Sequence, residues 1–247
     1  YFFGIEGVIP AFILLYIAQF IAIISFSYRA QRPTFALSRT YLTKGLPMLV
    51  LGISFALTGM INHGAQLSIR TFINNVGSIE AVGLFNAGYT IFTTLGSIAF
   101  ASLDSYYFPK LSGIFSDVAQ RRQTVIRQIK VTVSIIAPIS LIVISILGWL
   151  LPLLFSHEFD SVVPMAQIAV AGLLFRAVYL PFAYIPLSAG DSKTFLCLEF
   201  FSALILTGAV ITCYLNWGLM GAGIGLLVSN FIDMCVSVIV AKVKYKL

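Results

Sequence analysis

Long apolar runs constrain this chain more than any other feature of its sequence. Several runs extend for about 20 residues, which is the length of helix needed to cross the hydrocarbon core of a bilayer. The chain of 247 residues is 59% hydrophobic and only 10% charged, whereas soluble domains average about 25% charged residues. Lipid cannot satisfy backbone polar groups, and the alternation expected of a membrane β-barrel is absent, so the spans must be helices. We therefore predict an all-α integral membrane protein, a polytopic helix bundle.

Hydropathy divides the chain into about seven transmembrane helices. They are expected at Phe3–Phe26, Leu46–Ile69, Gly83–Phe108, Val131–Phe155, Val162–Pro186, Thr194–Leu215 and Leu219–Ala241. Alternate loops and the C-terminus together hold 13 of the 15 basic residues, namely Arg29, Arg32, Arg39, Lys44, Lys110, Arg121, Arg122, Arg127, Lys130, Lys193, Lys242, Lys244 and Lys246. The opposite loops hold only Arg70, and Arg176 lies within a span. The positive-inside rule then places the C-terminus in the cytoplasm and the N-terminus of this chain outside.

The remaining composition argues against other classes of protein. The formal charge of +6 comes from basic residues between spans rather than on one face, so it does not indicate nucleic-acid binding. Cys197, Cys213 and Cys235 lie inside apolar runs and read as small core residues. The two histidines are far apart, and no enzyme motif or catalytic constellation is present, so we predict that the protein is not an enzyme. No cofactor is indicated other than a coupling H⁺ or Na⁺.

A weak internal repeat suggests how the spans are organised. Gly4 and Gly7 open the first span, Gly218 and Gly221 open the last, and both spans are expected to run from outside to inside. Parallel repeats of this kind are typical of transporters. The first helix, residues 1–28, is then the last transmembrane helix of an N-terminal lobe. Residues 29–45 form a cytoplasmic inter-lobe loop, and residues 46–247 form a C-terminal six-helix lobe. Because the chain begins at Tyr1 inside an apolar segment, we expect a fragment with about five spans missing upstream.

Polar residues within the spans are the candidate functional groups, because each is costly in lipid. Asn62, Gln66 and Arg70 are spaced i, i+4 and i+8 and share one helix face, and Asn86 and Tyr89 begin a similar stripe on the next helix. Two interpretations stay open: the two faces line a polar substrate cavity, or they only form interhelical hydrogen bonds.

Three charged residues lie deeper in the predicted spans: Arg176, Glu199 and Asp233. In one interpretation, a carboxylate neutralises Arg176 and the pair fixes helix packing. In the other, Arg176 faces a water-filled lumen and attracts an anionic substrate, while Asp233 or Glu199 binds a coupling ion. The sequence does not decide between them.

The segment Ser112–Lys130 is the longest loop and carries a basic amphipathic pattern. Phe115, Val118 and Val125 can share one helix face against Arg121, Arg122 and Arg127. We predict a short helix lying on the cytoplasmic leaflet.

Several of these segments resemble one transporter family. The stretches Lys44-Gly45-Leu46-Pro47, Val82-Gly83-Leu84-Phe85-Asn86-Ala87-Gly88-Tyr89 and Tyr106-Tyr107-Phe108-Pro109-Lys110-Leu111-Ser112 occur in the order seen in polysaccharide (O-antigen, Wzx-type) flippases of the MOP exporter superfamily. The resemblance implies the C-terminal half of a two-lobed bundle of 12 to 14 helices with a central cationic cavity. Arg70 and Arg176 match the cavity cations of the family by their location in the spans.

The function implied by the resemblance is alternating-access transport of an undecaprenyl-pyrophosphate-linked oligosaccharide across the bacterial cytoplasmic (inner) membrane, for surface polysaccharide biosynthesis. Asn62, Gln66, Asn86 and Tyr89 would bind the sugars. The implied partners are the lipid-linked oligosaccharide, the bilayer and the polysaccharide polymerase and glycosyltransferase machinery, with no nucleic acid.

Three alternatives remain. A MATE-type cation-coupled multidrug exporter needs acidic cavity groups, which Glu199 and Asp233 supply. A seven-span receptor fits the helix count, but the outer loops lack a cysteine pair and the third span lacks Asp-Arg-Tyr at its inner end. A membrane scaffold needs no site at all.

Overall fold

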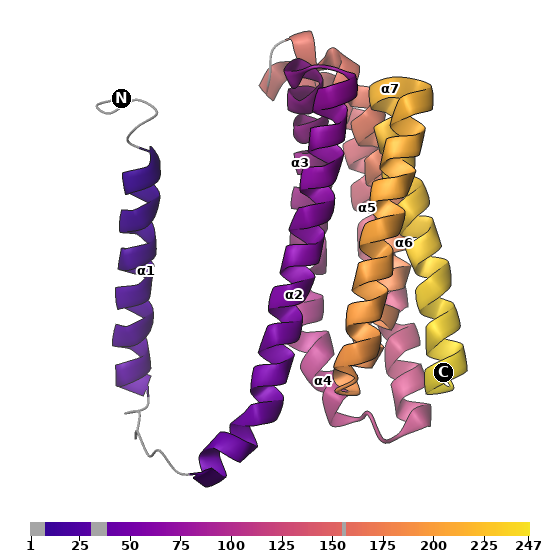
Figure 1. Ribbon diagram of the computed structural model, residues 1–247. Helices are drawn as coiled ribbons and strands as arrows, with labels where there is room; N and C mark the ends of the chain where they lie inside the picture. The colour runs from indigo at the N-terminus through magenta and orange to yellow at the C-terminus, as the bar shows by residue number, and fades with distance from the viewer. Residues whose placement is uncertain (1–7, 31–38, 155–156) are drawn as a thin grey trace. The chain divides into compact units, whose positions relative to one another are not determined.

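The computed structural model describes residues 8–30, 39–154 and 157–247, and within these ranges it is helical with short turns and no strand. The helices are α1 (Val8–Ala30), α2 (Arg39–Val76), α3 (Ile79–Ser102), α4 (Phe108–Gly113), α5 (Val118–Leu154), α6 (Val162–Ser188) and α7 (Ser192–Tyr245). A π-helical turn, Leu103–Tyr107, joins α3 to α4, and a 3₁₀ turn, His157–Ser161, precedes α6. The predicted all-α architecture is confirmed (Figure 1).

The chain divides into two compact units, Tyr1–Met48 and Leu49–Leu247, and α2 passes from the first to the second. The first unit contains α1, whose segment Ile9–Phe26 is apolar and long enough to cross a membrane. Gly4 and Gly7, on which the repeat interpretation depends, lie outside the described residues, as does Arg32. Residues 39–45, predicted as part of the inter-lobe loop, are helical, because hydropathy detects only the lipid-crossing part of a helix that extends beyond it. The predicted lobe boundaries stay predictions.

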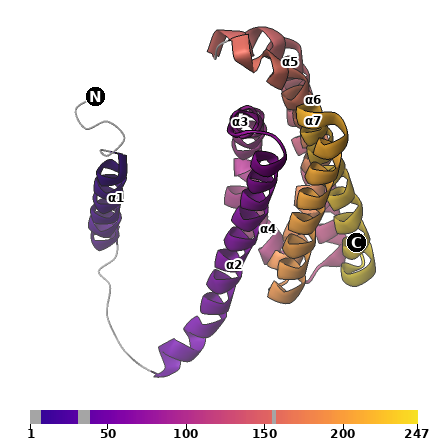
Figure 2. The same ribbon diagram turned by 45° about the horizontal axis from the view of Figure 1, so that its top comes forward.

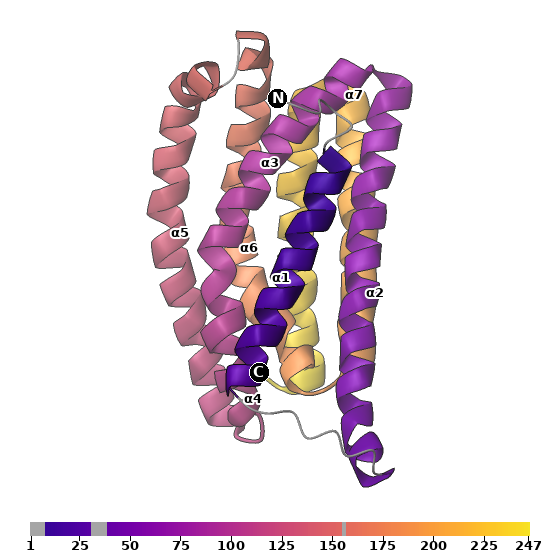
Figure 3. The same ribbon diagram turned by 90° about the vertical axis from the view of Figure 1, so that its left-hand side faces the viewer.

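The second unit is a bundle centred on α6. This helix packs against α3, α5 and α7, and Val162, Met165, Ala166, Ala169 and Val170 along it are fully buried. In Figure 3, α5 lies on the left of the bundle and α2 on the right, and α3 and α6 lie between them. Many large apolar side chains on the outer faces of the helices are exposed, as expected of surfaces that face lipid rather than water.

Among the described residues, five helices are long and apolar enough to cross a membrane. The longest, α7, has 54 residues, and a straight helix of that length would extend about 80 Å, far beyond any bilayer. It turns back at Gly218, where φ is 58° and ψ is −140°, a conformation that favours glycine. Its two arms, separated at Gly218, lie side by side in Figures 1 and 2. Counting both arms and α2, the structure agrees with the prediction of about seven helices.

The cytoplasmic helix predicted within Ser112–Lys130 is wrong as a separate element. α5 begins at Val118 and continues without a break to Leu154, so the amphipathic segment is the first part of a membrane-spanning helix. Arg121, predicted on its polar face, is buried; its guanidinium donates to the backbone oxygens of Phe115 and Tyr245. Buried carbonyl groups need hydrogen-bond donors. Arg121 supplies them to Phe115, just before α5, and to Tyr245, at the end of α7.

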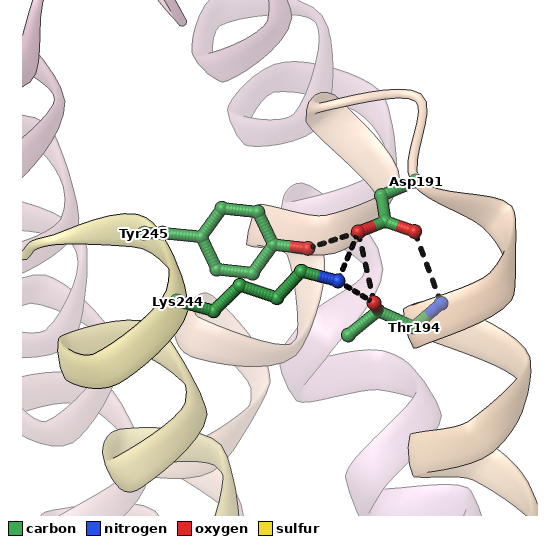
Figure 4. Close-up of polar contacts among 4 residues, drawn as sticks. All are labelled: Asp191, Thr194, Lys244 and Tyr245. Atoms are coloured by element: carbon green, nitrogen blue, oxygen red, sulfur yellow. Dashed lines mark hydrogen bonds and ion pairs between the residues drawn. The ribbon is translucent and has the colours of Figure 1, made fainter.

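A polar cluster joins the start of the first arm of α7 to the end of its second arm, away from the turn at Gly218 (Figure 4). Asp191 caps the first arm, because its Oδ1 accepts from the Thr194 backbone N at 3.1 Å. Its Oδ2 accepts from Lys244 Nζ at 2.6 Å and from the Tyr245 hydroxyl at 2.9 Å. Lys244 Nζ also contacts Thr194 Oγ1. The Lys244 ammonium holds the pKa of the Asp191 carboxyl group well below its usual range.

We expect Asp191→Ala to destabilise the fold more than Asp191→Asn. Alanine removes both the cap, which contributes about 1 kcal/mol, and the ion pair, which contributes less than about 1 kcal/mol because Lys244 is half-exposed. Asparagine keeps the cap and loses only the charge. The free energy of unfolding in detergent, measured for both variants at neutral pH, tests this order.

The same cluster predicts a pH dependence. A carboxyl group with a lowered folded-state pKa stabilises the fold above its unfolded value of about 4, and this stabilisation is lost as the pH falls through the folded value. The difference in stability between wild type and Asp191→Asn should therefore shrink under acid. A difference that stayed constant with pH would show that the charge of Asp191 contributes nothing.

Candidate functional site

Polar side chains from α2, α3, α6 and both arms of α7 line one cavity in the second unit, with a volume of about 300 Å³. Its lining consists of Asn62, Gln66, Tyr89, Phe92, Thr93, Arg176, Tyr179, Leu180, Glu199, Ser202, Leu206, Leu226, Ser229, Asn230 and Asp233. Charged and amide groups at this depth are costly unless they serve packing or function. Their concentration around one space makes this cavity the candidate site.

Helical periodicity explains why these residues meet. Each helix presents residues three or four positions apart, so that a single face of each points to the cavity. On α2 these are Asn62 and Gln66, and on α6 they are Arg176 and Tyr179. The turn at Gly218 brings the second arm of α7 back beside the first, which places Asp233 across from Ser202.

The two carboxylates each accept a hydrogen bond from a neighbouring helix or arm. Glu199 Oε2 accepts from Asn62 Nδ2 at 3.2 Å, which ties α7 to α2. Asp233 Oδ2 accepts from Ser202 Oγ at 2.8 Å, which ties the second arm of α7 to the first. Asp233 is buried, whereas Glu199 is partly buried. Both acids are therefore positioned by neutral donors.

Arg176 has no direct ion pair among the described residues. Its Nε is buried without a hydrogen-bond partner, and its guanidinium carbon lies 5.8 Å from the centre of the Phe92 ring. A cation over an aromatic face is attracted by the ring quadrupole, but this attraction does not replace hydrogen bonds to the guanidinium. The sequence leaves two interpretations of Arg176 open: an ion pair with Glu199 or Asp233, or a position facing a cavity. The structure favours the second. The guanidinium is available to an anionic group in the cavity.

Arg70 and Asn86 do not line the cavity. Arg70 Nε donates to Asn86 Oδ1 at 2.8 Å, joining α2 to α3. Arg70 and Asn86 therefore agree with the interpretation that polar residues form interhelical hydrogen bonds. Asn62, Gln66 and Tyr89 agree with the other interpretation, because they line the cavity. The substrate-binding role predicted for Asn62, Gln66 and Tyr89 stays a prediction, whereas the hydrogen bond between Arg70 and Asn86 supports a structural role for that pair.

An aromatic pocket of about 310 Å³ adjoins the polar cavity. Tyr179, Leu180 and Glu199 line both spaces. The remaining walls of the pocket are Phe55, Phe108, Ala183, Tyr184, Leu187 and Phe195, and these residues are apolar apart from the Tyr184 hydroxyl. The two spaces together offer a polar chamber next to an apolar one.

The sequence prediction did not include two polar cavity residues, Tyr179 and Ser202. A signal for both was present, because each lies three positions after a predicted charged residue, Arg176 and Glu199 respectively, and so shares its helix face. They were missed because a tyrosine and a serine in an apolar run are common and carry no charge to draw notice.

Comparison with solved structures identifies the fold. A MATE protein in complex with MaL6 has a TM-score of 0.79 at 15% identity, and the match covers 100% of this chain and 58% of that one. A MATE in the straight conformation gives 0.75 at 16% identity, covering 99% and 57%. An outward-facing multidrug resistance MATE family transporter of the MOP superfamily gives 0.78 at 17% identity, covering 100% and 58%. The chain thus spans less than two thirds of the length of these structures and has the fold of a multi-pass membrane transporter of the MOP superfamily.

The sequence places the chain more narrowly. Residues 2–164 match the family described as polysaccharide biosynthesis protein, and the chain belongs to that family. The predicted membership of a polysaccharide biosynthesis family is therefore confirmed, and the fold is similar to that of a MOP superfamily transporter, as predicted. Its fold is similar to that of solved membrane transporters. A search of curated proteins found no match to this chain.

Proposed function

We propose that this chain is part of a flippase that moves a lipid-linked oligosaccharide, carried on undecaprenyl pyrophosphate, across the bacterial cytoplasmic membrane for surface polysaccharide biosynthesis. The observation that carries the proposal is Arg176, a cation without an ion-pair partner among the described residues, beside a polar cavity in a polysaccharide biosynthesis family protein. A pyrophosphate carries negative charge and acceptor oxygens that suit a guanidinium, and such charge-assisted hydrogen bonds are strong.

The neutral polar groups of the cavity suit the rest of the headgroup. Asn62, Gln66, Tyr89 and Asn230 offer amide and hydroxyl groups that can donate to and accept from sugar hydroxyls. The adjoining aromatic pocket, with Phe55 and Phe195 on its walls, suits the first isoprene units of the carrier lipid. A substrate with a charged, a polar and an apolar part fits this pair of spaces.

Transport by alternating access requires a second lobe. The solved transporters that this chain resembles are longer, and the chain covers 57–58% of each. We propose that residues 1–28 belong to the N-terminal lobe and residues 46–247 form the C-terminal lobe, with 29–45 between them. The cavity of this chain then faces the opposite lobe and opens alternately to either side of the membrane. The polymerase and glycosyltransferases that make and use the oligosaccharide are the expected partners.

Glu199 and Asp233 are proposed to bind the coupling ion, H⁺ or Na⁺. With both acids charged, the cavity holds two negative groups and one positive group, Arg176, which disfavours an anionic substrate. A cation bound at the acids offsets their charge and leaves Arg176 free to hold the pyrophosphate. Substrate and ion binding are then coupled through the local charge.

The excess of acids over Arg176 also supports a second candidate, a MATE-type exporter of cationic drugs. The family match favours the polysaccharide substrate. The orientation follows from the basic loops: we propose that the C-terminus is cytoplasmic and the N-terminus of this chain is outside.

The test is deletion of the full-length gene in its own host, followed by complementation. We expect the deletion to abolish surface polysaccharide and to accumulate the lipid-linked oligosaccharide on the inner leaflet, and the gene to restore export. Drug susceptibility is measured on the same strains. Normal polysaccharide with raised drug sensitivity would replace the proposal with the drug exporter.

A further inference from the structure

We propose that the first part of α5 holds the headgroup of an anionic phospholipid from the surrounding bilayer. An open groove of about 780 Å³ runs along this segment, outside the transport cavity. It is lined by Val118, Ala119, Arg122, Gln123, Ile126, Arg127, Lys130 and Lys246. We call this set of residues the α5 groove.

The charges of the α5 groove are all of one sign. Arg122, Arg127, Lys130 and Lys246 supply four cations, and no carboxylate of the described residues lines the groove. All four are exposed, and their side chains make no hydrogen bond or ion pair within the part of the chain that the structure describes. Arg121 differs, because it is buried and donates to two backbone oxygens. The four groove cations are therefore free to bind an external anion, and Arg121 is not.

The depth of the groove matches the headgroup layer. The groove residues of α5 end at Lys130, and the rest of the span, Val131 to Leu151, contains no charged residue. Lys130 thus marks the boundary of the hydrocarbon, and Arg127 and Ile126 lie about 5 and 6 Å further along the helix axis, within the headgroup layer. Anionic headgroups at this level attract basic segments, with about 1 kcal/mol for each Lys or Arg near the surface.

The apolar part of the groove favours a lipid over a free phosphate. Val118 and Ile126 are 47% and 43% exposed and lie on the same helix face as Arg122 and Lys130, at intervals of four residues. Ile126, the nearer of the two to the hydrocarbon boundary, can cover the glycerol of a phospholipid, whereas it adds nothing to the binding of an inorganic ion. The volume of the groove also exceeds what a phosphate ion occupies.

The experiment uses the full-length protein purified in a neutral detergent and titrated with phosphatidylglycerol, with bound lipid counted by native mass spectrometry. The double variant Arg122→Gln with Arg127→Gln removes two groove cations. Its matched control, Lys193→Gln with Lys242→Gln, removes two exposed cations outside the groove. We expect about a 25-fold loss of affinity in the groove variant, about fivefold for each cation, and less than about a twofold loss in the control.

Three results would overturn the proposal. These are an equal loss in both double variants, equal affinity of the wild type for phosphatidylcholine, and displacement of the lipid by millimolar inorganic phosphate. A third variant, Arg122→Lys with Arg127→Lys, keeps the charge and should bind phosphatidylglycerol within about threefold of the wild type, so that a loss caused by misfolding is recognised.

Discussion

Arg176→Gln is expected to reduce transport of the lipid-linked oligosaccharide by about 10- to 100-fold. Glutamine keeps a polar side chain but removes the positive charge and the paired donors of the guanidinium. A hydrogen bond to a charged group contributes about 1.5–3 kcal/mol, and each 1.4 kcal/mol corresponds to a factor of ten. Among the described residues, no other cation lines the cavity, so no neighbour of that set replaces the lost charge. The measurement is surface polysaccharide in the deletion strain complemented with the variant, normalised to the amount of protein in the membrane.

Arg70→Gln is the matched control for this prediction. It makes the same chemical change in the same bundle, but Arg70 bonds to Asn86 and lies outside the cavity lining. We expect less than about a threefold loss of transport from Arg70→Gln. Arg176→Lys should fall between the wild type and Arg176→Gln, because lysine keeps the charge but not the planar fork. Normal export by Arg176→Gln, or an equal loss from Arg70→Gln, would remove Arg176 from the proposed role.

Sequence spacing located most of the polar cavity, because periodicity within a helix is a local property. Asn62 and Gln66 were grouped by their separation of four residues, and Arg176, Glu199 and Asp233 by their depth in the spans. What spacing cannot give is which helices are neighbours and how each is rotated. Arg70 lies on the same helix face as Asn62 and Gln66, one turn beyond Gln66. Its side chain nevertheless bonds to Asn86 and does not line the cavity.

The length of the apolar runs predicts the number of membrane-crossing segments, but it does not predict where each helix begins and ends. The spans beginning at Leu46 and Val131 start earlier as helices, at Arg39 and Val118, because polar residues continue a helix as readily as apolar ones outside the membrane. The last two predicted spans are the arms of α7, and the turn between them falls at Gly218. The sequence suggests that Gly218 and Gly221 repeat Gly4 and Gly7, but the hairpin also requires each of them: Gly218 has a positive φ, and Gly221 lies against the backbone of Cys213.

Gly221→Ala is expected to destabilise the protein by about 3 kcal/mol, the upper end of the usual cost of overpacking. A Cβ at this position would lie 2.0 Å from the carbonyl oxygen of Cys213 and 2.6 Å from its carbonyl carbon. Those atoms are backbone of the opposite arm, so no side chain can rotate away and the two arms must separate. Small residues permit such close approach of helices in membranes, where packing rather than the hydrophobic effect holds helices together. The loss should appear as a lower unfolding temperature in detergent and a lower yield of folded protein.

Gly208→Ala, in the first arm of the same hairpin, is the control. A Cβ at Gly208 would meet no atom within 4 Å, so the same substitution should change the free energy of unfolding by less than about 1 kcal/mol, and alanine is the better helix former. Gly225→Ala should behave like Gly221→Ala, because its Cβ would lie 2.5 Å from the Cα of Val210. Equal stability of the Gly221 and Gly208 variants would mean that the arms are not in backbone contact. The position of Asp233 opposite Ser202, and with it one wall of the cavity, would then lose its support, since that position depends on the closeness of the arms.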